Sequence, residues 1–188
     1  MKILLINLDQ SIDRLDQQRI QFKDLDLDFQ RLPAVSIHDF SEAEYKEMAF
    51  NGQRPMKQSE LACFLSHKKA WEYVVEHNEP CVVLEDDAIL VKDFKKILND
   101  LTQLNKIDYV NLEVHGRKKT VAKKSTYSLA DNNFNLLEIY IDRSGTGGYV
   151  LYPTGAKILL DFMNKRAIGL SDEFIHNCYE LKAYQIEP

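Results

Sequence analysis

Three adjacent carboxylates follow a short apolar run near the middle of the chain. Glu85, Asp86 and Asp87 come directly after residues 82–84, which are Val-Val-Leu. Neighbouring negative charges repel one another unless solvent screens them or a cation sits among them. Hard divalent cations prefer oxygen ligands, and Mg²⁺ commonly uses one or two carboxylates together with substrate phosphates. The segment therefore predicts a metal-assisted site, and the alternative is an acidic turn that caps the next element.

Apolar runs predict the strands that would carry such a site. Residues 3–6 are apolar without alternation, as in a strand covered on both faces, and residues 81–84 repeat this pattern just before the acidic triplet. Further strands are predicted at residues 27–32, 109–112, 136–141 and 149–152. Between the strands at 109–112 and 136–141 lies a polar stretch rich in Lys, Ser and Asn.

Helical spacing and cap residues fill the remaining segments. Helices are predicted at residues 11–22, at 41–50 behind an N-cap Ser41, from Ser59 to Asn78, at 94–104, from Pro153, and behind an N-cap Ser171. Strands that alternate with helices favour a single α/β domain over residues 1–188, with a mostly parallel sheet flanked by helices. Open sheets of this class bind ligands at the carboxyl ends of their strands, where the acidic triplet would lie.

Composition limits the class of protein. Of 188 residues, 45% are hydrophobic and 28% charged, which is typical of a globular domain. The net charge of −5 argues against binding to nucleic acid through its phosphates. The three cysteines match neither a disulfide framework nor a zinc motif. Neither a secretory signal nor a membrane-spanning stretch is visible, so we expect a cytoplasmic protein with reduced thiols.

One dense basic cluster stands out against the acidic background. A run of this kind is usually a solvated loop, and the alternative is attraction to anionic lipid headgroups or an acidic glycan, which would place the protein peripherally at the inner membrane. The cluster consists of Arg117, Lys118, Lys119, Lys123 and Lys124.

Several segments, taken in order along the chain, resemble glycosyltransferase family 25, the bacterial lipooligosaccharide galactosyltransferases and their relatives. They are Ile6-Asn7-Leu8-Asp9 with Asp13-Arg14, Glu60-Leu61-Ala62-Cys63-Phe64-Leu65-Ser66-His67 with Trp71, Leu84-Glu85-Asp86-Asp87-Ala88, Gly145-Thr146-Gly147-Gly148-Tyr149-Val150 with Gly155-Ala156-Lys157, and Asp172. The family usually continues beyond the position that corresponds to Pro188. The chain is therefore expected to be either a short form or one without a C-terminal acceptor or membrane-contact segment.

This resemblance implies a Rossmann-like domain of the GT-A type that acts on nucleotide sugars. The implied reaction is inverting transfer of galactose from UDP-galactose to a saccharide or glycolipid acceptor in lipooligosaccharide or lipopolysaccharide biosynthesis. The implied cofactor is a divalent metal, Mn²⁺ or Mg²⁺, held by Asp87 and Glu85. Asp172 is the expected general base, and capping of its helix is the alternative.

The resemblance also implies a set of donor-binding residues, several of which have ordinary structural alternatives. His67 shares a helical face with Phe64 and Trp71, so it could be a hydrogen-bonded core histidine. Glu60 could favour a helix N-terminus, and Asn7 could stabilise a turn. The implied donor-binding residues are Asn7, Arg14, Glu60, Ser66, His67, Glu85, Asp86 and Gly147.

Two other functions remain open from the residues alone. One is a nucleotide-sugar-binding protein without transfer activity. The other is a metal-dependent phosphoryl-transfer enzyme, although the chain lacks the P-loop and kinase motifs that such enzymes commonly carry.

Overall fold

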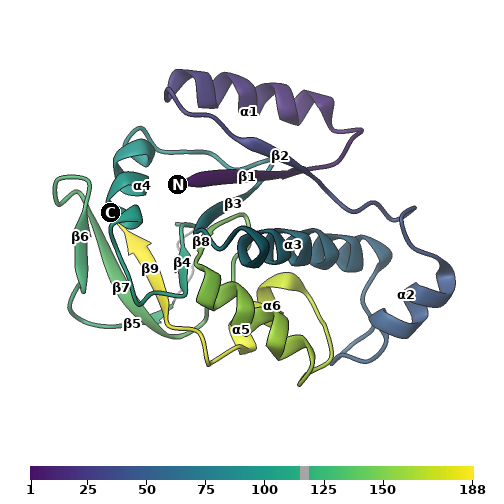
Figure 1. Cartoon of the computed structure of the whole chain (residues 1–188). Coiled ribbons are helices and arrows are strands. Elements are labelled where there is room, and N and C mark those ends of the chain that lie inside the picture. The colour runs from purple at the N-terminus through teal and green to yellow at the C-terminus, as the bar shows by residue number, and fades with distance from the viewer. Residues whose placement is uncertain (115–118) are drawn as a thin grey trace.

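A mixed sheet forms the centre of the protein, and the computed structural model describes residues 1–114 and 119–188 around it (Figure 1). The strand order is β2-β1-β3-β8-β4-β9-β7-β5, with β6 paired to β7. The strands are β1 (Lys2–Asn7), β2 (Gln30–Pro33), β3 (Cys81–Glu85), β4 (Tyr109–Asn111), β5 (Thr120–Val121), β6 (Tyr127–Leu129), β7 (Phe134–Ile141), β8 (Gly148–Leu151) and β9 (Ala183–Glu187). The helices are α1 (Ile12–Asp24), α2 (Glu42–Ala49), α3 (Gln58–His77), α4 (Phe94–Thr102), α5 (Pro153–Met163) and α6 (Ser171–Asn177).

Two hydrophobic cores lie on opposite faces of the sheet, which explains the continuous apolar runs of its central strands. In β1, Ile3 and Leu5 pack into the core that includes residues of α1 and α4, whereas Leu4 and Ile6 pack into the core that includes residues of α3, α5 and α6. Figure 1 shows α1 on one side of β1, with α3, α5 and α6 together on the other. Strands buried on both faces need apolar residues at successive positions, as the sequence predicts.

The prediction of a mostly parallel sheet was wrong. In the described residues β1 pairs in parallel with β2 and β3, and β4 with β9, but the other five strand pairings are antiparallel. Strand β8 runs antiparallel between β3 and β4. Its residues are buried on both faces, so the apolar pattern is the same in either direction and carries no information on strand polarity.

Most predicted elements are present, and three strands were missed. Ser41 caps α2 in a capping box with Glu44, and Asn78 ends α3 in the left-handed conformation. The predicted N-cap role of Ser171 was wrong, because α6 begins at that residue and its N-cap is Leu170. Strands β5 and β6 lie in the polar stretch, and β9 lies near the C-terminus.

The topology brings several strand ends to one edge of the sheet. Parallel β1 and β3 both finish there, with Ile6 in register with Glu85. Antiparallel β8 begins at the same edge, because Leu84 is opposite Gly148. Strand β4 ends beside it, with Asn111 opposite Tyr149. The polar residues that follow these strands therefore meet at one place.

No helix within residues 1–114 and 119–188 is both long and apolar enough to cross a bilayer. Of the basic cluster, Arg117 and Lys118 lie outside the described residues. Lys119 is half-buried and donates to the carbonyl oxygen of Ser144 at 2.9 Å, whereas Lys123 and Lys124 are exposed.

Gly155, at the start of α5, allows a very close approach to β4. A Cβ atom at this position would lie 2.2 Å from the backbone carbonyl oxygen of Asp108, so the backbone would have to move. We expect Gly155→Ala to reduce the free energy of unfolding by about 1–3 kcal/mol, the usual range for overpacking.

Denaturant unfolding measures this change, and Gly169→Ala is the matched control. The nearest atom to a Cβ at Gly169 is a side-chain oxygen of Glu173 at 3.5 Å, an ordinary contact. Equal stability of the two variants would show that the contact between Gly155 and Asp108 is looser than described.

Candidate active site

A cavity of about 350 Å³ opens beside the ends of β1 and β3. It lies between these strand ends, the segment 34–38 that follows β2, and the first half of α3. Six of the predicted site residues line it: Asn7, Arg14, Ser66, His67, Glu85 and Asp86. The structure therefore brings together residues that are up to 79 positions apart in the sequence.

Asp86 is fixed by two polar partners from the N-terminal segment. Its Oδ2 accepts a hydrogen bond from Nδ2 of buried Asn7 at 2.7 Å, and its Oδ1 pairs with Nη1 of Arg14 at 2.9 Å. The Asp86 side chain is only 11% exposed. Its carboxylate raises the pKa of Arg14, through a hydrogen bond and through charge attraction. Asp86 thus orients two side chains at the rim of the cavity.

Asp87 lies at the opposite side of the acidic segment, against a second cavity of about 470 Å³. The Asp87 side chain is 63% exposed, and its nearest charged partner in the described chain is Arg14, at 3.9 Å. The second cavity is mostly apolar, and Glu113 supplies a further carboxylate. Its apolar lining includes Leu84, Ala88, Ile89, Leu90, Val91, Phe94, Leu112, Phe134 and Ile186. Polar or charged residues make up 11 of the 18 that line the first cavity, which we call the polar cavity, and two of the 15 that line the second, which we call the apolar cavity. Apolar surface predominates in both, and the acidic segment lies between them.

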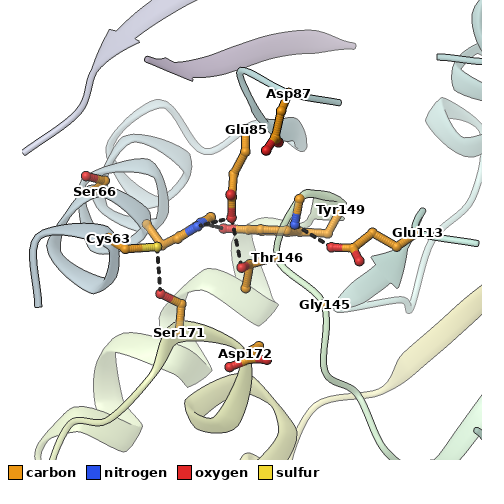
Figure 2. A network of polar contacts seen from close by, with 12 residues as sticks. Cys63, Ser66, Glu85, Asp87, Glu113, Gly145, Thr146, Tyr149, Ser171 and Asp172 are labelled. Atoms are coloured by element: carbon orange, nitrogen blue, oxygen red, sulfur yellow. Dashed lines mark hydrogen bonds and ion pairs between the residues drawn. The ribbon is translucent and has the colours of Figure 1, made fainter. Parts of the chain in front are cut away.

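Glu85 ends a chain of hydrogen bonds that begins in the core. Trp71 Nε1 donates to the hydroxyl of Tyr149 at 3.0 Å, and Nδ1 of fully buried His67 lies 3.0 Å from the same hydroxyl. His67 Nε2 lies 3.2 Å from Glu85 Oε1, which also accepts from the hydroxyl of Thr146 at 2.9 Å. Figure 2 shows Glu85 reaching from β3 toward Thr146, while Asp87 takes no part in the hydrogen bonds drawn.

This network couples the charges of His67 and Glu85. Burial opposes a charge on His67, but Tyr149, Cys63 and Glu85 outweigh it and raise the His67 pKa well above its usual value. Burial also opposes the charge on Glu85, yet hydrogen bonds from His67 and Thr146 lower its pKa. The contact between the two side chains therefore favours the charged form of each, an imidazolium beside a carboxylate.

Two predicted donor-binding residues are held by contacts within the protein. Glu60 forms a bidentate ion pair with Arg54 and accepts from the backbone N–H of Lys57, as in a capping box. The Ser66 hydroxyl accepts from the backbone N–H of Val35 at 2.8 Å and donates to the carbonyl oxygen of Ala62. Ser66 thus ties the segment after β2 to α3 and shapes the wall of the cavity.

The loop before β8 places Gly147 against a carboxylate that is missing from the predicted site. The backbone N–H of Gly147 donates to Oε1 of Glu113, and the carbonyl oxygen of Gly147 accepts from the backbone N–H of Glu85 at 3.0 Å. Gly145 has φ +109°, in the region that favours glycine. A strand that ends in an acidic residue, the pattern that identified Glu85, also occurs at Glu113 and could have identified it.

Asp172 lies in the first turn of α6, where its Oδ1 accepts a hydrogen bond from the backbone N–H of Glu173 at 2.8 Å. In Figure 2, Asp172 and Asp87 lie on opposite sides of Thr146. The pKa of Tyr109 lies well above its usual value, first because of burial and then because of the charges of Tyr149, Glu113 and Asp172. Tyr109 donates to the carbonyl oxygen of Gly145, so Asp172 and Glu113 both lie near that loop.

One group of side chains in the described residues could hold a metal ion, and it differs from the predicted pair. Cys63, His67 and Glu85 each offer one ligand atom, and these atoms all lie within 4.8 Å of one another. The sequence predicted Glu85 as a ligand together with Asp87, but it did not suggest Cys63. The spacing of Cys63 and His67, four residues apart on one helix, is the signal that could have revealed it.

Comparison with known proteins identifies the family of the chain. Residues 1–175 match the family described as "Glycosyltransferase family 25 (LPS biosynthesis protein)". The chain belongs to glycosyltransferase family 25. It is 28% identical to a "Glycosyltransferase 25 family member" of Aedes aegypti, over 92% of this chain and 30% of that relative.

Two further relatives of this family 25 chain have more specific names. "Procollagen galactosyltransferase 2" of Homo sapiens is 26% identical over the whole chain and 34% of its own length. "Lacto-N-neotetraose biosynthesis glycosyltransferase LgtE" of Neisseria meningitidis serogroup B is 31% identical over 58% of this chain and 41% of its own length. The chain thus spans 30–41% of the length of these three relatives.

The contacts of Glu60 generate a prediction on stability. The Arg54 guanidinium and the Lys57 backbone N–H lower the pKa of Glu60 from its ordinary 4.5 to about 2. A lowered pKa stabilises the fold above pH 4.5, and this stabilisation is lost as the pH falls toward 2. We expect Glu60→Gln to be about 1 kcal/mol less stable than the parent at pH 7, because partial exposure weakens the ion pair, and equally stable near pH 2.

Denaturant unfolding between pH 7 and pH 2 measures this difference. Arg54→Gln is the matched control, and it should give the same pH dependence because it removes the other half of the pair. If Glu60→Gln instead leaves stability unchanged and weakens binding of UDP, Glu60 is a donor ligand rather than a cap.

Proposed function

We propose that this domain transfers a sugar from a nucleotide donor to a saccharide acceptor, with galactose from UDP-galactose as the donor sugar. The observation that carries the proposal is the placement of the acidic segment, in which Glu85 and Asp86 line the polar cavity and Asp87 lines the apolar cavity. The polar cavity suits a nucleotide diphosphate sugar, and the apolar cavity suits the ring face and apolar part of an acceptor. The names of two relatives support galactose and glycan assembly, and the family description supports an acceptor in lipooligosaccharide or lipopolysaccharide biosynthesis.

The donor is proposed to occupy the cavity lined by Asn7, Arg14 and Asp86. Arg14 is 52% exposed at its rim and can turn from Asp86 toward a phosphate, which a guanidinium can bind through two N–H groups. Asn7 also accepts from Arg31 Nε at 2.9 Å, so its side chain is held by three polar partners. The fixed amide of Asn7 and the half-exposed guanidinium of Arg14 would together orient the sugar diphosphate above Glu85.

Asp87 fits a hard divalent cation, Mn²⁺ or Mg²⁺. Its carboxylate is exposed, whereas the carboxylates of Asp86 and Glu85 are engaged by protein donors. A single available carboxylate is enough when substrate phosphates supply the remaining oxygen ligands. When bound, such a cation would neutralise the negative charge that develops on the departing diphosphate. We therefore propose Asp87 as the principal ligand and Glu85 as a group that positions the loop.

The acceptor hydroxyl must lose a proton as it attacks the anomeric carbon. In an inverting reaction the new bond forms on the face opposite the bond to UDP, and the proton passes to a general base. We propose Asp172 for this role, since its charge acts on Tyr109, whose hydroxyl contacts Gly145, and since it has no cationic partner within 4 Å in the described residues. Glu113 is the competing candidate, because it lines the apolar cavity together with Asp87.

The metal assignment predicts that Asp87→Ala loses at least about a hundredfold in turnover, the scale for removing one preorganised electrostatic group. The melting temperature should stay unchanged, because the side chain is 63% exposed. Product analysis with UDP-galactose and saccharide acceptors, with and without added Mn²⁺, measures this. Asp93→Ala is the matched control, as it changes an aspartate in the same segment outside both cavities.

Asp87→Ala that remains fully active in the presence of a chelator would contradict a role for metal at this residue. Binding of UDP-galactose by the parent chain without any transfer product would instead indicate a binding protein. Phosphate transfer to the acceptor would indicate a phosphoryl-transfer enzyme.

The base assignment predicts that Asp172→Asn lowers kcat by about a hundredfold or more while UDP affinity and melting temperature stay near the parent values. Asparagine keeps the side-chain oxygen that accepts from Glu173, so a helix-capping role would survive the change. Glu113→Gln is the paired variant, because its amide oxygen can still accept from Gly147. Near-normal turnover in Asp172→Asn with a large loss in Glu113→Gln would assign the base to Glu113.

A further inference from the structure

A compact group of side chains lines the polar cavity and consists of Cys63, His67 and Glu85. The proposed reaction gives a role to Glu85 but none to Cys63. The side chains of Cys63 and His67 project from one face of α3, one helical turn apart, and Glu85 reaches them from the end of β3. Their ligand atoms lie within 4.8 Å of one another. Atoms bonded to one Zn²⁺ lie about 3.5 Å apart, because the bonds are about 2.0–2.3 Å long. The group therefore needs to contract by only about 1 Å.

Each of the three side chains contacts a further polar side chain, as metal ligands commonly do in proteins. His67 Nδ1 contacts the Tyr149 hydroxyl at 3.0 Å, which leaves Nε2 directed at the group. Glu85 Oε1 accepts from Thr146, and the Cys63 sulfur lies 3.5 Å from the Ser171 hydroxyl. Figure 2 shows these contacts converging from α3, α6 and the loop before β8. Outer contacts of this type fix ring orientation and support metal affinity.

The chemistry of the donors selects the ion. A thiolate and an imidazole favour Zn²⁺, whereas Mg²⁺ and Mn²⁺ prefer carboxylate, carbonyl and water oxygens. Three protein ligands leave a fourth tetrahedral position open, and all three residues line the polar cavity. An ion held here would therefore face the space proposed for the donor.

We propose that Cys63, His67 and Glu85 form a Zn²⁺ site, separate from the oxygen site at Asp87, and that its occupation inhibits the protein. As Zn²⁺ binds, the Cys63 thiol and His67 Nε2 each release a proton to solvent, and metal–ligand bonds replace the contact between His67 and Glu85. The bound ion then occupies the floor of the polar cavity. The binding step stands on its own, whereas inhibition rests on the proposed function.

Cys63 can be distinguished experimentally from the other two thiols. Cys63 is exposed, and Cys81 and Cys178 are buried. Burial raises the pKa of Cys81 to about 12 and that of Cys178 to about 11, so both remain protonated and unreactive. Alkylation of the folded protein should therefore report on Cys63, and a metal bound there should protect it.

The binding test uses the full chain with Co²⁺ as a spectroscopic probe and Zn²⁺ for calorimetry, both with excess Mg²⁺ present. We expect one ion per chain, a sulfur-to-cobalt charge-transfer band, and protection of Cys63 from iodoacetamide. Cys63→Ser should lose the band and weaken Zn²⁺ binding by at least about tenfold, and Glu85→Gln should weaken it similarly. A chain with Cys81→Ala and Cys178→Ala should keep both the band and the affinity.

Zn²⁺ binding that is unchanged in Cys63→Ser, or a Co²⁺ complex without the charge-transfer band, would overturn the site. Inhibition has its own measurement, in which Zn²⁺ should weaken UDP binding at fixed Mg²⁺ in the parent chain but not in Cys63→Ser. If Zn²⁺ does not affect UDP binding while the cobalt band is present, the inhibition is contradicted and the metal site is supported. Absence of UDP binding under all conditions would count against the proposed function alone.

Discussion

The candidate site depends on a buried chain of hydrogen bonds that starts at Trp71 and runs through Tyr149, His67 and Glu85 to Thr146. It joins α3, β8, β3 and the loop before β8 in one network. The fully buried ring of His67 needs a partner for each nitrogen, and the Tyr149 hydroxyl and the Glu85 carboxylate supply them. Removing Glu85 would leave one nitrogen of the buried His67 ring without its hydrogen-bond partner, which typically costs about 1–3 kcal/mol.

That network divides the three adjacent carboxylates among three tasks. Glu85 faces inward and balances His67, and Asp86 turns toward Asn7 and Arg14. Asp87 is 63% exposed, and its nearest charged partner in the described residues, Arg14, lies 3.9 Å away. Repulsion among the three neighbouring acids is thus reduced by protein groups that contact two of them, His67 and Thr146 at Glu85 and Asn7 and Arg14 at Asp86. Asp87 has the most exposed carboxylate of the three, which is why we propose it for the oxygen-ligand site.

The antiparallel insertion of β8 makes this arrangement possible. Because β8 runs opposite to β3, its first residue lies beside the carboxyl end of β3, and the preceding loop delivers Thr146 and Gly147 to Glu85. A parallel strand in this place would bring its last residue there instead. The same loop contacts Glu113 at the end of β4, so it links both cavities to the sheet edge.

The sequence by itself determined the strands and helices with strong patterns, the acidic segment at a strand end, and the family. Continuous apolar runs identify β1 and β3 because burial on both faces demands them, and Asn78 ends α3 for a local backbone reason. Strand direction and short edge strands such as β5 were not predictable, because their hydrogen bonds depend on distant partners. Likewise, only the tertiary structure decided that Glu85 pairs with His67 rather than with Asp87, and that Cys63 joins them, because these contacts connect α3 to β3 across the packed core.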